Sequence, residues 1–121
     1  MREPAKTFKD LIVWQRAYQL VLAIYKITAD FPKHEMYGIV SQVRRASVSI
    51  AANIVEGFRK RSPADKARFM NISQGSLEEV RYYLILAEDL KYAKTNELHK
   101  QISEVSKLLE AYRSSILNSE F

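Results

Sequence analysis

Apolar side chains recur at intervals of three and four residues along almost the whole chain, and this pattern is interrupted only at a few short turn signals. In a helix, residues three and four apart share one face, whereas a half-buried strand would alternate apolar and polar residues. Only three Gly and three Pro occur among 121 residues. A sheet protein with many tight turns needs more of both, so the chain is predicted to be all-α.

Turn signals divide the chain into four helices. Thr7 and Asp10 have the spacing of a capping box, and Pro32 ends the helix that follows them. Ser62 and Pro63 provide the N-cap and the first position of a later helix. The predicted helices span about 9–29, 35–58, 63–91 and 96–117. Their short connections force neighbours to be antiparallel, which predicts a single domain over residues 1–121, an up-down-up-down four-helix bundle.

The composition also limits where the protein works. There is no cysteine, which excludes a disulfide framework and a thiolate nucleophile or metal site, and fits a reducing compartment. Residues 1–10 carry charges without an apolar stretch, so no signal peptide is predicted. The longest uncharged run, 46–55, is too short for a membrane span, which needs about 20 apolar residues. We therefore expect a cytoplasmic protein with no membrane contact.

The helix at 9–29 has more apolar surface than one bundle can cover. Its polar residues fall in one sector of roughly 100° of the helical wheel, and most of the remaining circumference is apolar. The surplus lies either on the side of Val13, Leu20 and Ile27 or on the side of Leu11, Tyr18 and Leu22. It is either partly exposed, covered by the N-terminal arm, or an interface with another subunit. We favour a homo-oligomer, with an interface that includes Val13, Trp14, Tyr18, Leu20 and Ile27.

A line of polar residues follows the helix at 35–58, beside its apolar face. Its members are Gln42, Arg45, Ser49, Asn53 and Glu56. One interpretation is a hydrogen-bonded seam that fixes the register against polar residues of the next helix, such as Ser73, Gln74 and Glu79. The other is a polar pocket or an interface contact. Catalysis is the least favoured interpretation, because the line contains no histidine and no second acid beside Glu56.

Sequence patterns of known catalytic and metal sites are missing. His34 and His99 lie near predicted helix ends, and neither belongs to an H-x-x-x-H or E-x-x-H pattern that would bind metal in a bundle. No glycine-rich phosphate loop is present. We therefore predict no catalytic residue, no metal and no cofactor, and expect a protein that binds rather than an enzyme.

Positive charge is concentrated in one part of the chain. The net charge is +5, and residues 31–62 carry six Lys and Arg against two acids. The candidate contacts for nucleic acid are Arg44, Arg59, Lys60, Arg61, Lys66 and Arg68. Such a group attracts a phosphate backbone without reading its sequence. The alternative is a patch that only keeps the protein soluble.

Four segments carry a resemblance to a known family. They are F-x-x-L-x-V-W starting at Phe8, F-P-x-x-E-x-Y-G over 31–38, Q-V-R-R-A-S-V-S-I-A-A-N-I-V-E-G over 42–57, and G-S-L-E-E over 75–79. This pattern resembles the four-helix bundle proteins of the 23S rRNA-intervening-sequence family, from about Phe8 to Ile116. The segment over 42–57 is the most specific part.

The resemblance implies a bundle that assembles as a homopentamer. Some members are encoded inside insertions in bacterial ribosomal RNA genes. A related protein is the basic, pentameric accessory protein of diversity-generating retroelements, which binds nucleic acid and a reverse transcriptase. The family supplies no catalytic residues. The first hypothesis is therefore an oligomeric module that binds RNA or DNA or assists a nucleic-acid-handling protein. The second is a scaffold whose partners are only proteins.

Overall fold

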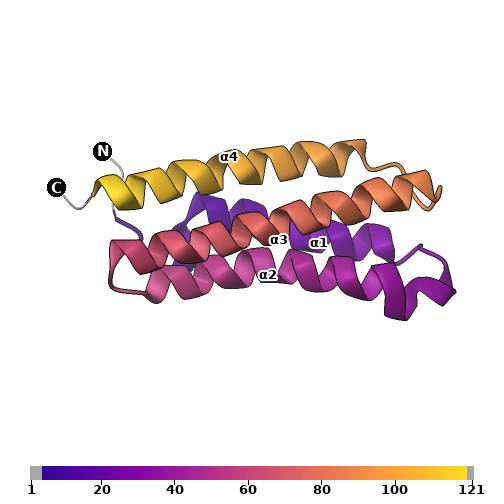
Figure 1. Cartoon of the computed structure of the whole chain (residues 1–121), viewed down its shortest axis with the longest axis horizontal. Helices are drawn as coiled ribbons and strands as arrows, with labels where there is room; N and C mark the ends of the chain where they lie inside the picture. The colour runs from indigo at the N-terminus through magenta and orange to yellow at the C-terminus, as the bar shows by residue number, and fades with distance from the viewer. Residues whose placement is uncertain (1–3, 120–121) are drawn as a thin grey trace.

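The chain is all-α, as the sequence predicts. A computed structural model describes residues 4–119, and within that range it contains four α-helices and no strand. The helices are α1 (Ile12–Thr28), α2 (Ser41–Arg59), α3 (Pro63–Asp89) and α4 (Asn96–Asn118) (Figure 1). Residues 1–3 and 120–121 of the predicted domain lie outside the described residues.

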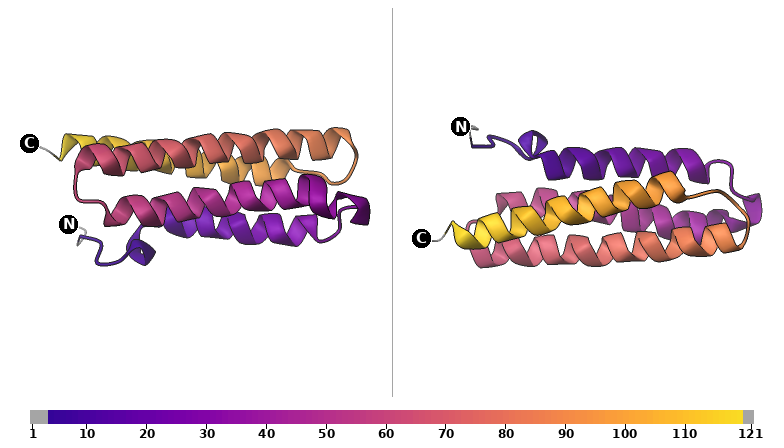
Figure 2. Two further views of the ribbon diagram at one scale, coloured as in Figure 1. Left: turned by 60° about the horizontal axis from the view of Figure 1, so that its bottom comes forward. Right: turned by 90° about the horizontal axis from the view of Figure 1, so that it is seen from above.

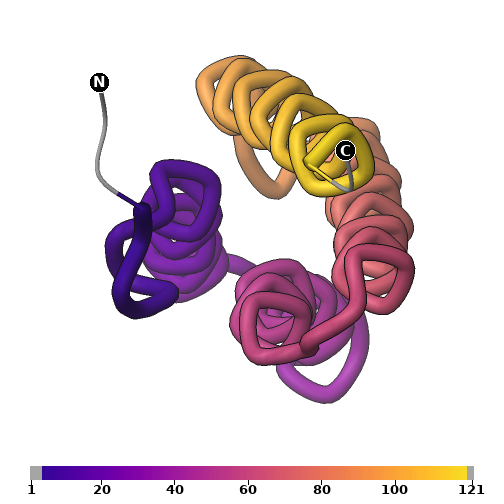
Figure 3. Tube along the Cα trace, turned by 90° about the vertical axis from the view of Figure 1, so that its left-hand side faces the viewer, coloured from indigo at the N-terminus to yellow at the C-terminus, as the bar shows by residue number. Residues whose placement is uncertain are grey.

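The four helices lie side by side as one elongated bundle. The start of α1, the α2–α3 turn and the end of α4 share one end of the molecule, here called the terminal end (Figures 1 and 2). The α1–α2 and α3–α4 connections lie at the opposite end, here called the far end. Seen along the bundle, the helices follow one another round a ring, and α1 also contacts α4 (Figure 3).

The core runs along the axis of this ring. Every helix contributes side chains with no exposed surface, such as Ile24 from α1, Ile54 from α2, Leu77 from α3 and Leu109 from α4. Burying one side chain of this size contributes about 1.5–3 kcal/mol relative to leaving it in water. The three-and-four spacing places such residues on one face of each helix, and this face holds the bundle together.

The first helix begins at Ile12 rather than near Lys9. The capping box is present, because Thr7 Oγ1 accepts from Lys9 N at 3.2 Å and the Asp10 carboxylate accepts from Thr7 N at 3.1 Å. It caps only a single 3₁₀ turn, η1 (Phe8–Asp10). Leu11 is extended and separates this turn from α1. The sequence signal therefore predicted the cap correctly but not the break behind it.

The second helix begins at Ser41, so the predicted start near Glu35 is wrong. The 3₁₀ turn η2 (Lys33–Glu35) and the π turn η3 (Met36–Val40) precede it, and Gly38 has non-helical dihedral angles. This detour buries Phe31, Ile39 and Val40 against Ala87 of α3 in a small second core at the far end. A straight helix from Glu35 would have a different path and would not bury these side chains in the same way. The burial of the connection therefore decides the backbone path here, against the helical spacing of the sequence.

The ends of α3 have clear physical causes. Ser62 Oγ accepts from Asp65 N at 3.0 Å, and Pro63 fills the first helical position, as predicted. At the other end, Lys91 adopts a left-handed conformation with φ of 65°. The amide of Tyr92 then donates to the carbonyl of Ala87 at 2.9 Å and closes the helix.

Candidate nucleic-acid interface

Five of the six candidate cations gather around the α2–α3 turn. Since α2 ends at Arg59 and α3 begins at Pro63, only residues 60–62 separate the two helices. The short turn therefore places Arg59, Lys60 and Arg61 together at the end of the bundle. The first turns of α3 add Lys66 and Arg68. We call Arg59, Lys60, Arg61, Lys66 and Arg68 the basic cluster. Four of these side chains are exposed, and Lys66 is partly buried.

Aromatic rings support two members of the basic cluster. The Lys60 ammonium lies 5.2 Å from the centre of the Phe69 ring, and the Arg68 guanidinium lies 4.7 Å from it. Phe69 itself is buried against the core. Each cation–π contact contributes about 0.5–1 kcal/mol at an exposed site and limits how far the side chain moves. Phe69 therefore holds two cations together on the surface.

Lys66 has a structural as well as an electrostatic role. Its Nζ donates to the carbonyl of Phe58 at 2.6 Å and lies 5.3 Å from the centre of the Phe58 ring. This carbonyl is in the last turn of α2, where backbone acceptors lack helical partners and the helix dipole favours a cation. Partial burial lowers the pKa of Lys66. Lys66 thus ties α3 to the end of α2.

The basic cluster keeps most of its charge unneutralised. Among residues 4–119 its one acidic partner is Asp65, whose carboxylate lies 3.7 Å from Arg68 Nε. Both side chains are more than half exposed, so this pair contributes only about 0–1 kcal/mol. Within residues 4–119, Arg59, Lys60 and Arg61 form no ion pair. The turn therefore presents a positive surface suited to phosphate groups.

Arg44 does not belong to this surface, and its role as a nucleic-acid contact stays a prediction. Its Nε donates to Thr28 Oγ1 at 2.8 Å, and Nη2 donates to the Tyr25 carbonyl at 3.3 Å. The guanidinium also lies 4.6 Å from the centre of the Tyr25 ring. Arg44 is thus committed to the C-terminal end of α1, where unpaired carbonyls attract a cation.

The polar line of α2 is in part a hydrogen-bonded seam. Ser49 Oγ and Ser76 Oγ are 2.8 Å apart, and Asn53 Nδ2 donates to the carbonyl and hydroxyl of Ser49 at 2.8 and 3.0 Å. Ser73 Oγ donates to the Ile50 carbonyl at 2.8 Å. The Ser49–Ser76 and Ser73–Ile50 bonds link α2 to α3, whereas Asn53 holds Ser49 from within α2, and together they support the structural interpretation for the middle of the line. Gln42, Arg45 and Glu56 are exposed and take no part in these bonds.

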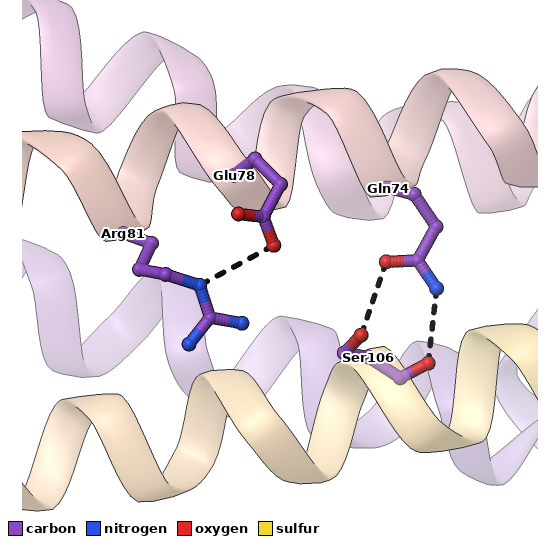
Figure 4. A network of polar contacts seen from close by, with 4 residues as sticks. All are labelled: Gln74, Glu78, Arg81 and Ser106. Carbon is purple, nitrogen blue, oxygen red and sulfur yellow. Dashed lines mark hydrogen bonds and ion pairs between the residues drawn. The ribbon is translucent and has the colours of Figure 1, made fainter.

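Gln74 faces a different helix from the one expected. Its Nε2 donates to the Ser106 carbonyl at 3.0 Å, and Ser106 Oγ donates to Gln74 Oε1 at 3.2 Å. Figure 4 shows this pair beside the Glu78–Arg81 ion pair of 3.3 Å. Gln74 therefore joins α3 to α4 rather than to the seam.

Two of the predicted interface residues lie inside the chain's own core. Val13 and Leu20 are buried among the four helices, so they are unavailable to another subunit. This corrects the prediction for both, because the wheel alone could not distinguish the core side of α1 from its surplus side. Trp14 and Ile27 are partly buried and pack against the core. Tyr18 is exposed.

The surplus apolar surface of α1 lies on the side of Leu11, Tyr18 and Leu22, and not on the side of Val13, Leu20 and Ile27. Tyr18 is 43% exposed, Leu22 48% and Tyr25 43%, and we call these three residues the α1 stripe. The Trp14 ring stacks on Tyr18 at 5.0 Å and extends the stripe toward the terminal end. Tyr25 was absent from the predicted interface, although its spacing from Tyr18 and Leu22 places it on the same face.

The described residues contain no cluster of side chains arranged for metal binding. No three or more His, Asp and Glu side chains lie close enough together to hold an ion within 4–119. The ring of His34 instead lies 6.5 Å from that of Tyr92. In the same part of the chain, no helix combines the length and apolar character needed to cross a membrane.

The fold and the sequence both have known relatives. A solved protein of unknown function from the S23 ribosomal protein family of Bacteroides thetaiotaomicron VPI-5482 has the same fold, with a TM-score of 0.75 and 24% identity. The match covers 84% of this chain and 98% of that one. No curated protein matches. Residues 9–111 match the family described as 23S rRNA-intervening sequence protein, and the chain belongs to this family.

Proposed function

We propose that the chain is a non-enzymatic cytoplasmic protein that binds RNA or DNA through the basic cluster. It acts by itself or as an accessory factor to a nucleic-acid-handling protein such as a reverse transcriptase. The observation that carries the proposal is the concentration of cations at the α2–α3 turn, where Asp65 is their one acidic partner in the part of the chain that the structure describes. The reference to ribosomal RNA in the family description supports the same class of ligand.

The chemistry of the basic cluster favours backbone contact over sequence readout. Cations at phosphates release bound counterions, and this gives affinity that falls steeply as salt rises. Phe69 and the Phe58 carbonyl hold Lys60, Arg68 and Lys66 in place. Less side-chain freedom is then lost when a phosphate binds.

We also propose that the up-down-up-down bundle assembles into a homo-oligomer. The family resemblance implies that this oligomer is a pentamer. The α1 stripe supports this part, because three large apolar side chains at helical spacing are each more than two-fifths exposed. Copies in a ring would repeat the basic cluster, and their fields would add. Solution mass measurement tests it, since an assembly exceeds the 14.0 kDa of one chain.

The deciding experiment reverses charge at the turn. The triple variant Arg59→Glu, Lys60→Glu and Arg61→Glu changes exposed side chains only. We expect at least about a hundredfold loss of affinity for a fluorescent RNA or DNA, and a salt slope smaller by about 2 to 3, since each of three phosphate contacts contributes roughly 0.7–0.9. Circular dichroism should show an unchanged helical fold.

A matched control reverses the same number of charges at the far end. Lys33, Lys91 and Lys94 are exposed there, and their change to Glu alters net charge equally. We expect this control to retain most of the affinity. Equal loss in both triple variants would mean that net charge, and not the basic cluster, attracts the nucleic acid.

A protein-only scaffold is the second candidate. It is favoured by Tyr37, which is 91% exposed on the π turn at the far end, next to the exposed Met36. Exposed aromatic residues on an ordered turn are typical anchors of protein interfaces. A purified oligomer that shifts neither RNA nor DNA at low salt would support the scaffold and overturn nucleic-acid binding.

A further inference from the structure

An open groove lies at the terminal end, between the start of α1 and the last turns of α4, two segments that Figure 2 shows at the same end of the molecule. Its volume is about 920 Å³, which is within the range of small-molecule sites. Its walls include the apolar side chains of Leu11, Ile12, Phe58, Leu108, Ala111 and Tyr112. Lys6, Asp10 and Ser115 add polar groups.

One wall of the groove is held in place by hydrogen bonds. The Asp10 carboxylate accepts from Lys6 N at 2.9 Å and from Thr7 N at 3.1 Å, which ties the N-terminal arm to η1. Gln15 Nε2 then donates to the Lys9 carbonyl at 2.8 Å and ties η1 to α1. The groove is therefore formed before any ligand arrives.

The groove and the basic cluster meet at Phe58. Phe58 lines the groove, while its carbonyl accepts from Lys66 Nζ and the same ammonium lies over its ring. Arg59 follows Phe58 directly and is exposed. A groove with both apolar and polar walls thus opens beside a group of cations, with Lys6 as a further cation on its own wall.

We propose that this groove takes an unpaired base of a single-stranded nucleic acid whose phosphates lie on the basic cluster, an assignment that rests on the proposed function. A base has flat apolar faces and a polar edge, which matches aliphatic and aromatic walls with polar groups at the rim. Its phosphates require cations within one or two nucleotides, and the basic cluster supplies them. In a duplex the bases are stacked and paired, so none enters the groove without being extruded.

The test fills the groove without touching the basic cluster. Ala111 lines the groove and is exposed, so Ala111→Trp puts a large ring into it, and Ser115→Trp does the same one helical turn away. Ala29→Trp is the matched control, because Ala29 is exposed at the far end and outside the groove. The probes are oligouridine and oligodeoxythymidine of about 12 nucleotides, within the footprint of common single-strand sites, and a duplex of equal length.

We expect both groove variants to lose roughly tenfold or more in affinity for the single strands, as when one stacked base is lost, and to bind the duplex as the wild type does. The control should bind all three probes normally. Photo-crosslinking of 5-bromouracil in the single strand should label the peptide that contains Tyr112 or the one that contains Phe58. Oligouridine and oligodeoxythymidine report separately whether RNA or DNA is preferred.

Several results would overturn the base-binding groove while leaving the proposed function intact. They are unchanged single-strand affinity in both well-folded groove variants, an equal loss for single strand and duplex, or a smaller assembly mass in the groove variants. The last result would make a second copy of the chain the occupant. If the wild type binds no probe, the proposed function itself fails.

Discussion

The two ends of the bundle differ in how much apolar surface their connections bury. At the far end, the long α1–α2 connection buries Phe31, Ile39 and Val40 against α3 and seals the bundle with a second small core. At the terminal end, the α2–α3 turn is too short to bury anything, and an open groove remains between α1 and α4. A connection long enough to fold back closes one end, whereas a minimal turn leaves the other end accessible and densely charged.

The hydrogen bonds also differ between the two ends. The Tyr92 hydroxyl donates to Glu35 Oε2 at 2.7 Å, and Glu88 accepts from the amide and hydroxyl of Thr95 at 2.8 and 2.9 Å. These bonds tie the connections to the helix ends. The cations of the terminal end instead contact two phenylalanine rings and a backbone carbonyl and leave their charge available. The bonds of the far end thus fix its connections, whereas the cations of the terminal end stay free to meet an anion.

The largest expected effect on stability compares one phenylalanine from each end. Phe31→Ala empties the second core at the far end and should cost about 3–5 kcal/mol in the free energy of unfolding. Phe58→Ala removes a partly exposed groove wall at the terminal end and should cost less than half as much, since less apolar surface is buried there. Urea unfolding measures both. Equal costs would contradict the division into a sealed end and an open end.

A smaller effect is expected where α2 and α3 approach each other near the basic cluster. A Cβ added at Gly57 would lie 2.5 Å from Met70 Cε and 2.8 Å from Phe69 Cβ. Gly57→Ala should therefore destabilise by about 1–3 kcal/mol, despite the better helix propensity of alanine.

Gly75→Ala is the control for this effect, because nothing lies within 4 Å of the added Cβ. It should stabilise by about 0.5–1 kcal/mol. Thermal unfolding that moves both variants in the same direction would show that helix propensity, and not close packing at the terminal end, decides the result at Gly57.

The turn that ends α3 at the far end should tolerate glycine better than the natural residue. Lys91 has a φ of 65°, a conformation that costs an L-residue about 1–2 kcal/mol and glycine nearly nothing. Lys91→Gly should stabilise by about 0.5–1 kcal/mol after the larger entropy of the unfolded glycine chain is subtracted. Lys94→Gly, which removes the same charge nearby, should not stabilise in the same unfolding assay.

The smallest expected effect is the pH dependence of the far end. The hydrogen bond from Tyr92 holds the pKa of Glu35 below its ordinary value of 4.5 and raises the pKa of Tyr92 above 10.0. A lowered acid pKa stabilises the fold above pH 4.5, and this contribution is lost as pH falls through the folded value. A raised tyrosine pKa stabilises below pH 10.0, and this contribution is lost as pH rises through the folded value.

Tyr92→Phe removes both contributions together. The difference in unfolding free energy between wild type and variant should be constant between about pH 5 and 9 and shrink toward both extremes. A difference that stays the same at pH 3 would mean that the hydroxyl stabilises through packing alone. Arg113→Leu, which breaks the Glu110 ion pair on α4, controls for acid effects outside the far end.

Local signals in the sequence predict the helices well and their connections poorly. Ser62 and Pro63 start α3 at the predicted residue because an N-cap acts within one helical turn. The sequence around Gly38 carries no comparable signal. The helix is interrupted there because the connection then packs against α3, which is distant in the chain. The predicted start of α2 near Glu35 fails for that reason.

The candidate site shows the same limit. The basic cluster follows from charges adjacent in sequence, so a short turn was enough to predict it. Arg44 carries the same charge, yet its partners on α1 are 16 and 19 positions away. The wheel assigns Val13 and Leu20 to the predicted interface, because it shows how wide an apolar face is and not what covers it. The groove at Phe58 has no sequence signal, since its walls come from three helices and the N-terminal arm.

The sequence by itself determined the helical class, the caps and the density of charge at the α2–α3 turn. These depend on residues a few positions apart, where backbone geometry alone sets the distances. Only the tertiary structure decided which face of α1 stays exposed, which arginine is committed to the fold and where the groove opens. Those outcomes depend on how the four helices pack around one core. The packing contacts join residues that are far apart in sequence, so no local sequence pattern predicts them.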